Sequence, residues 1–109
     1  MADSRKRLLP EAMRLIDSTT LTGSYQAVGT PLAHESRVLL FVSESDSTVT
    51  VSWDGTTDAF RLVAGGQFVF DESSNAVSNS VFVTSAGTQF YVKGVAGTGD
   101  ITISTFYAN

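Results

Sequence analysis

Few residues of this chain could carry out nucleophilic or acid–base chemistry. His34 is its one histidine, and it contains no cysteine. A nucleophilic triad would place His34 beside a serine and an acid, but serine and threonine make up a quarter of the chain, so no single serine stands out. We interpret His34, which lies in a polar stretch next to Glu35, as a solvated loop residue.

Two pairs of acidic residues could bind a metal or transfer a proton. Asp54 and Asp58 enclose a turn at Gly55, but they lack the alternating acids and the terminal glutamate of an EF-hand. We therefore predict that Asp54 caps the turn. Asp71 and Glu72 are adjacent, and adjacent residues of an extended chain point to opposite sides, which argues against a glycosidase acid pair.

The remaining candidates favour structural roles. Residues 94–99 are rich in glycine but lack the Gly-Lys-Ser/Thr of a phosphate-binding loop, so we predict a hairpin turn there. Trp53 shares a strand face with Val49 and Val51 and is expected to pack in the core. The three tyrosines suit either a core or an interface. We expect no catalytic residue, no cofactor and no metal, and hence not an enzyme.

The elements that would position these residues are short strands. Residues 37–43 form a continuous apolar run, typical of a central strand covered on both faces, and residues 48–53 alternate most clearly between apolar and polar. Turn residues separate about eight such segments. The expected strands cover residues 19–28, 37–43, 48–53, 57–63, 67–70, 79–84, 89–95 and 100–107. This pattern predicts an all-β protein, an antiparallel β-sandwich with jelly-roll or immunoglobulin-like connectivity.

Residues 1–18 follow a different pattern. Apolar side chains recur there at helical spacing, at Leu9, Ala12, Met13 and Ile16, and Pro10 suits the first turn of a helix. We predict a short N-terminal helical arm at residues 1–18, followed by a sandwich domain at residues 19–109.

The charge distribution limits the partners. The formal net charge is −4, which argues against nucleic acid as a partner. Arg5 and Arg7 give the arm a basic start, and we expect them to bind a partner chain together with the apolar side chains of Leu9, Met13 and Ile16. No apolar run is long enough for a secretion signal or a membrane helix, so we expect synthesis in the cytoplasm and no membrane partner.

Three segments carry a likeness to a known group of proteins. They are the opening at residues 21–32, the turn Ser52-Trp53-Asp54-Gly55-Thr56-Thr57-Asp58 before a strand that ends in Asp71, and the closing strand Gly99-Asp100-Ile101-Thr102-Ile103 with its aromatic end, Phe106-Tyr107. The pattern resembles small virion structural proteins of tailed bacteriophages. This resemblance implies a non-enzymatic subunit of the capsid, the head–tail connector or the tail. Such a subunit would be made in the host cytoplasm and would assemble in the virion with copies of itself and with other virion proteins.

An alternative is a carbohydrate- or cell-surface-binding module of a virion, because the same fold serves both roles. The polar loops at residues 44–47, 54–58 and 71–78 would then contact the ligand, with or without calcium. None of these loops contains an aromatic residue on which a sugar could stack, so we prefer the structural role.

Overall fold

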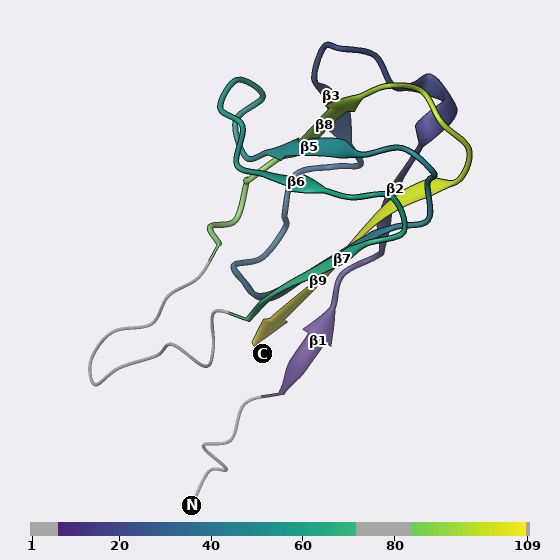
Figure 1. The fold of residues 1–109 in the computed structure, drawn as a ribbon. Helices are drawn as coiled ribbons and strands as arrows, with labels where there is room; N and C mark the ends of the chain where they lie inside the picture. The colour runs from purple at the N-terminus through teal and green to yellow at the C-terminus, as the bar shows by residue number, and fades with distance from the viewer. Residues whose placement is uncertain (1–6, 72–83, 109) are drawn as a thin grey trace, which may run out of the picture.

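The computed structural model describes residues 7–71 and 84–108, which form two antiparallel sheets packed face to face (Figure 1). The elements are β1 (Leu8–Pro10), β2 (Arg14–Asp17), the 3₁₀ helix η1 (Ser18–Thr20), β3 (Gln26–Val28), β4 (Ser36–Ser43), β5 (Val49–Ser52), β6 (Phe60–Leu62), β7 (Gln67–Asp71), β8 (Phe90–Gly94) and β9 (Asp100–Ala108). The predicted all-β sandwich is confirmed.

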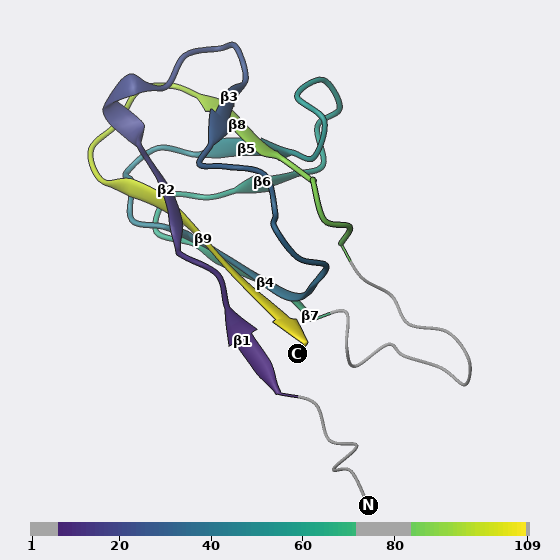
Figure 2. The ribbon, with the colours of Figure 1, turned by 180° about the vertical axis from the view of Figure 1, so that it is seen from behind.

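Each sheet has a defined strand order. Sheet A runs β1-β9-β4-β7, with β2 also paired to β9, and sheet B runs β3-β8-β5-β6. Strand β9 is the longest, and β1 and β2 lie one after the other along its edge (Figure 2). As predicted, the apolar run at residues 37–43 forms a central strand, β4, which pairs with β9 on one side and β7 on the other.

The core lies between the two sheets. Its fully or nearly fully buried apolar side chains are Leu21, Val28, Leu32, Leu39, Phe41, Val49, Val51, Leu62, Phe90, Val92, Ile101 and Ile103. The ring of Phe41 lies at its centre, 5.1 Å from the ring of Phe60 and 5.6 Å from that of Phe90. Trp53 packs against this cluster, with its ring 5.4 Å from Phe90, so its predicted place in the core is confirmed.

The predicted helical arm is wrong. Residues 8–10 and 14–17 are strands that pair with β9, and the only helical element in the described part of this segment is the one-turn η1. A helix of about two turns is marginal in water. The edge of β9 offers this segment backbone hydrogen bonds and burial at the same time, so tertiary pairing overrides the helical spacing.

Three predicted features fall partly or wholly outside the described residues. They are Arg5, most of the strand predicted at residues 79–84, and the polar loop predicted at residues 71–78, apart from Asp71. Thr84, the last residue of that predicted strand, forms an isolated antiparallel bridge to Ser36 at the start of β4.

Candidate interaction surface

An extra residue between β1 and β2 decides which side chains of the N-terminal segment face inward. Pro10 pairs with Phe106 and Arg14 with Ile103, so four steps along this segment match three steps along β9. A one-residue offset in an antiparallel pair moves the following side chains to the opposite face. Arg14 therefore points between the sheets, and Leu15 points outward.

The inward side chain of Arg14 is buried, with 6% of its surface exposed, and it is fully engaged. Its Nε donates to the carbonyl of Thr30 at 2.7 Å, and its Nη2 donates to Glu11 Oε1 at 2.9 Å and to the carbonyl of Pro31 at 3.1 Å. Gly29 has a φ of 64°, and a Cβ there would lie 2.7 Å from Arg14 Cγ. The arginine thus fastens the loop after β3 to the N-terminal strands.

Glu11 completes this buried cluster. Its carboxylate accepts hydrogen bonds from the backbone N–H of Ala33 at 3.3 Å and of His34 at 2.9 Å, and it lies 3.1 Å from His34 Nδ1. Burial acts to raise the pKa of Glu11, but the hydrogen bonds from Arg14, Ala33 and His34 outweigh it and lower the pKa to about 2.

His34 is half exposed, as expected of a loop histidine, but it is also held in place. Its ring stacks on that of Tyr107, with centroids 3.7 Å apart and planes within 6°. The His34 ring therefore contacts the carboxylate of Glu11 and the ring of Tyr107. This arrangement docks a loop onto β9 and does not resemble a nucleophilic triad.

The opposite side of sheet A has a different character. Pairing and strand alternation place a set of uncharged side chains on one surface, which we call the outer face of sheet A. They are Leu8, Leu15, Val38, Leu40, Val42, Val69, Thr102, Ser104 and Phe106. The same registers place Asp17, Asp71 and Asp100 at the margin of this face, whereas apolar residues occupy its centre, where Leu40 lies between Ser104 and Val69.

No described segment covers the outer face of sheet A. Leu8 and Leu15 are each 49% exposed and Val69 is 53% exposed. An antiparallel sheet with one solvated face ordinarily alternates apolar and polar residues, with the polar ones toward water. The sequence predicted that both faces of β4 are covered, but the described residues cover its inner face alone. The outer face of sheet A is therefore the strongest candidate for an interface.

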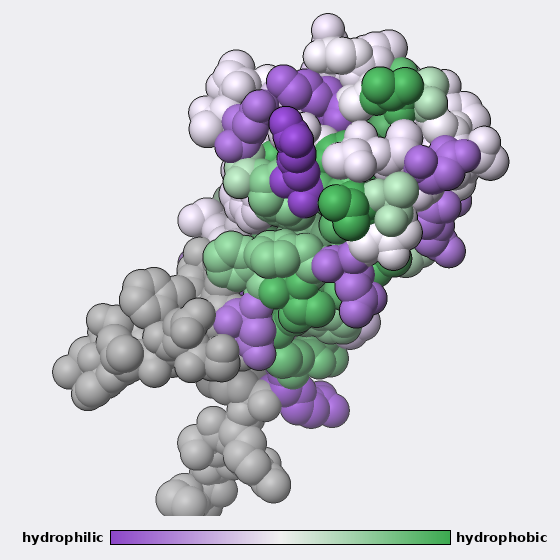
Figure 3. All heavy atoms as spheres, in the orientation of Figure 1, coloured by the Kyte–Doolittle hydropathy of each residue, from purple (hydrophilic) through white to green (hydrophobic). Residues whose placement is uncertain are grey.

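The outer side of sheet B is polar by comparison. The hydroxyl of Tyr25 donates to Asp58, and Lys93 Nζ lies 3.2 Å from Asp58 Oδ1 and 4.5 Å from the centroid of the Tyr25 ring. Desolvation and the hydrogen bond to Asp58 together raise the pKa of Tyr25 to about 12. Figure 3 shows strongly hydrophilic side chains over the upper sheet and a hydrophobic band below them, over β6 and β7.

The turn after β5 is built as the sequence predicts. Asp54 Oδ1 accepts hydrogen bonds from the backbone N–H of Thr56 at 2.8 Å and of Thr57 at 2.7 Å. These bonds, joined by one from the Ser52 hydroxyl, hold the pKa of Asp54 well below its usual range. The prediction that Asp54 caps the turn is confirmed, and within the described ranges no cluster of His, Asp and Glu could hold a metal ion.

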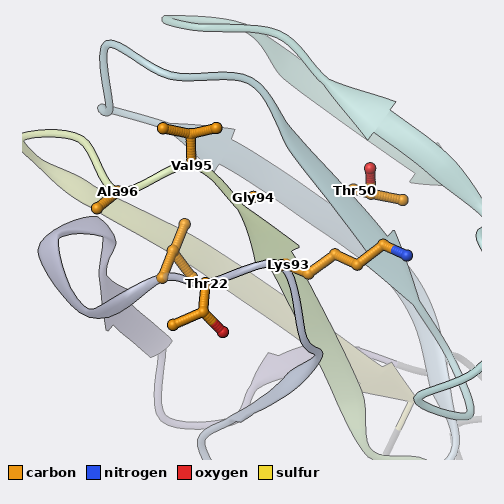
Figure 4. Close-up of a pocket in the computed structure, with 8 residues that line it drawn as sticks. Thr22, Thr50, Lys93, Gly94, Val95 and Ala96 are labelled. Carbon is orange, nitrogen blue, oxygen red and sulfur yellow. The ribbon is translucent and has the colours of Figure 1, made fainter.

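Sheet B also borders a hollow of about 370 Å³, lined by Leu21, Thr22, Gly23, Thr50, Lys93, Gly94, Val95 and Ala96. Figure 4 shows the side chain of Lys93 extending below Thr50, away from Val95 and Ala96. The hollow therefore has an apolar end beside the β8–β9 loop and a cationic end beside the Tyr25–Asp58 pair.

The structure separates the partner-binding residues predicted from the sequence. Arg7 and Met13 are exposed, Met13 by 56%, whereas Leu9 and Ile16 are half-buried. Ile16 packs against the core. The predicted apolar stripe is therefore not one surface. The residues that sequence reasoning missed, above all Leu15 and those of β4, had one signal, the unbroken apolar run at residues 37–43.

No protein-family model, curated protein or solved structure matches this chain. In the part of the chain that the structure describes, no helix is long and apolar enough to span a membrane.

Proposed function

We propose that the chain is a non-enzymatic structural subunit of a virion and that it assembles through the outer face of sheet A. The observation that carries this proposal is the apolar centre of that face, which no described segment covers. Strands about 4.8 Å apart with a rise of about 3.3 Å per residue give four strands of this length a face on the order of 450 Å². The largest apolar patch on a single domain is often about this size and is often functional, which supports the proposal.

We also infer the jelly-roll alternative over the immunoglobulin-like one. Between β2 and β9 the chain changes sheet at every connection except β5–β6, and β9 lies between the N-terminal strands and β4. This order matches the two Greek keys of a jelly roll, an architecture found in viral capsid and lectin domains. Because a fold does not by itself fix a function, the connectivity supports the virion role without carrying it.

The solution mass of the purified chain tests assembly through this face. We expect light scattering to give an oligomer for the natural chain and a lower mass for the double variant Leu15→Thr, Leu40→Thr. Val63→Thr is the matched control, because Val63 is 59% exposed but follows β6 of sheet B. Equal masses for the double variant and the control would refute assembly through the outer face.

The virion role has its own test. Mass spectrometry of purified particles of the virus that encodes the chain should find it in a fixed ratio to the other structural proteins. Its absence from the particles would refute the virion role, even if the chain assembles in solution.

A carbohydrate-binding module remains a second candidate, favoured by one observation. Tyr25, Lys93 and Asp58 form a joined aromatic and polar group beside the hollow on sheet B. A glycan array with the natural chain and Tyr25→Ala, each with and without calcium, tests it. Binding that the substitution abolishes would support this role, and no binding in any arm would remove it.

A further inference from the structure

Within residues 7–71 and 84–108, the edge that β7 gives to sheet A has little protection. Strand β7 pairs with β4 on one side, and no described strand pairs with the other. All five of its residues are exposed, the strand contains no Lys, Arg or Pro, and its one charged residue, Asp71, is at its end. Proteins ordinarily blunt such edges with short strands or charged side chains. The edge strand of sheet B does so, since β6 has three residues with exposed Arg61 at its centre.

The backbone of β7 has a definite orientation. The N–H of Ser43 donates to the carbonyl of Gly66 at 2.8 Å, so Gly66 directs its polar group toward β4. Residues of an antiparallel strand alternate in this respect. Phe68 and Phe70 therefore direct their backbone groups toward β4, and Val69, between them, directs its N–H and C=O toward the open edge.

The sequence of β7 is nearly the same in both directions. It reads Gln67-Phe68-Val69-Phe70-Asp71, with Val69 at the centre. We propose that two copies of this chain pair through β7, antiparallel, about a two-fold axis that passes beside Val69. Val69 then pairs with its own copy, Phe68 lies opposite Phe70, and Asp71 lies opposite the neutral Gln67. No like charges meet directly, as a self-complementary interface requires.

The inner side of β7 supports this pairing. Phe68 and Phe70 turn toward the core, with the ring of Phe68 4.7 Å from that of Phe60, yet they remain 39% and 36% exposed. They leave the aromatic cluster partly open at this side of the sandwich. In the pair, each phenylalanine gains an aromatic neighbour across the strands.

The pairing also enlarges the outer face of sheet A. A two-fold axis perpendicular to the sheet places both outer faces on the same side, as one continuous surface. A single face, on the order of 450 Å², is smaller than the roughly 800 Å² that each partner buries in a stable complex, and two joined faces reach it. This inference goes beyond the proposed function and does not depend on it.

Two substitutions at Val69 test the backbone pairing. Val69→Pro removes an N–H that points away from β4, so the sandwich should keep its fold while the dimer is lost. Val69→Thr keeps the N–H and the shape of the side chain, so it should dimerise within about threefold of the natural chain. The measurement is sedimentation equilibrium, with circular dichroism as the check on folding. A natural chain that stays monomeric at millimolar concentration would overturn the inference, as would a Val69→Pro chain that dimerises normally.

A cross-link locates the interface, because the chain has no cysteine of its own. A directly hydrogen-bonded antiparallel pair has a Cα–Cα distance of about 5.5 Å, which a disulfide can span. Val69→Cys should therefore form a covalent dimer on mild oxidation at least tenfold faster than Val95→Cys, because Val95 is 78% exposed in the loop after β8, away from both β7 and the outer face of sheet A. Equal rates would overturn edge pairing. If the Leu15→Thr, Leu40→Thr double variant still forms the Val69→Cys dimer, the edge pairs independently, and a failure of the proposed function would leave this inference standing.

Discussion

The outer faces of the two sheets differ although both sheets share one core. On sheet B, the directly paired residues Arg61, Thr50 and Lys93 form a polar row across the strands. On sheet A, the equivalent row through β4 places Leu40 between Ser104 and Val69. The inner faces of both sheets must be apolar because they form the shared core. Only the outer faces can therefore indicate which sheet contacts a partner. Under the proposed function, sheet B faces water and sheet A faces another chain.

The two outer faces are also stabilised in different ways. On sheet B, Asp58 joins Tyr25 and Lys93 at the surface, where solvent screens the charges. On sheet A, the strands that carry Leu8 and Leu15 are held from behind by the buried pair of Arg14 and Glu11. The apolar face thus depends on a buried ionic cluster, and the polar face depends on exposed contacts. Substitutions in the buried ionic cluster should therefore affect sheet A, and substitutions in the exposed contacts should affect sheet B.

The largest effect is expected from Arg14→Met. It removes the guanidinium from the carboxylate of Glu11 and leaves the carbonyls of Thr30 and Pro31 without their Arg14 donors. Breaking a buried pair in this way costs about 3–5 kcal/mol of unfolding free energy. Urea denaturation measures the loss, and hydrogen exchange should show β2 opening before β5. Arg14→Lys, which keeps the charge without the fork of donors, is the matched control and should lose less. A loss below about 1 kcal/mol would contradict the role of the cluster.

Acid should weaken the same cluster. The pKa of Glu11 falls from 4.5 to about 2 on folding, so its contribution is complete above pH 4.5 and is lost as the pH falls toward 2. The difference corresponds to roughly 3 kcal/mol of unfolding free energy.

Urea denaturation at several pH values, with Glu11→Gln as the comparison, isolates this contribution. The comparison is needed because Asp17, Asp54 and Asp58 also have lowered pKa values and titrate in the same range. The natural chain should lose more stability across this window than Glu11→Gln. Parallel curves for the two chains would show that Glu11 makes no such contribution.

The smallest effect is expected on sheet B. Asp58→Asn removes the negative charge and weakens the hydrogen bond acceptor of Tyr25, so the pKa of Tyr25 should fall from about 12 toward its ordinary 10.0. Ultraviolet titration of the phenol measures this, with Tyr25→Phe to identify its signal among the three tyrosines. The mass of the assembled chain should not change. An altered mass would mean that sheet B also takes part in assembly.

The sequence predicted the strands where alternation was long enough to read. The expected ranges 37–43 and 48–53 correspond to β4 (Ser36–Ser43) and β5 (Val49–Ser52), and the Asp54 cap follows from local turn chemistry. The N-terminal segment was misread because its strands have three and four residues, too few to show a period of two. The spacing of its apolar residues also fits a helix, and only the pairing with β9 shows that the segment forms strands.

The candidate surface was predictable in part. The unbroken apolar run of β4 indicated that both of its faces avoid water, which is a property of the residues alone. Which strands extend that surface depends on registers between distant segments, such as Leu15 beside Thr102 and Leu40 beside Val69. One extra residue before β2 turns Leu15 outward and Arg14 inward, and strand periodicity alone cannot fix such an offset.

The sequence by itself therefore determined the fold class and the Asp54 turn, because these depend on composition and on neighbouring residues, whereas the hairpin predicted at residues 94–99 is wrong, since this loop connects β8 of sheet B to β9 of sheet A. The tertiary structure decided the N-terminal strands, the buried Arg14–Glu11 pair and the extent of the apolar face. These features arise where segments far apart in the chain compete to pair with one edge, and the outcome depends on the free energy of the whole sheet.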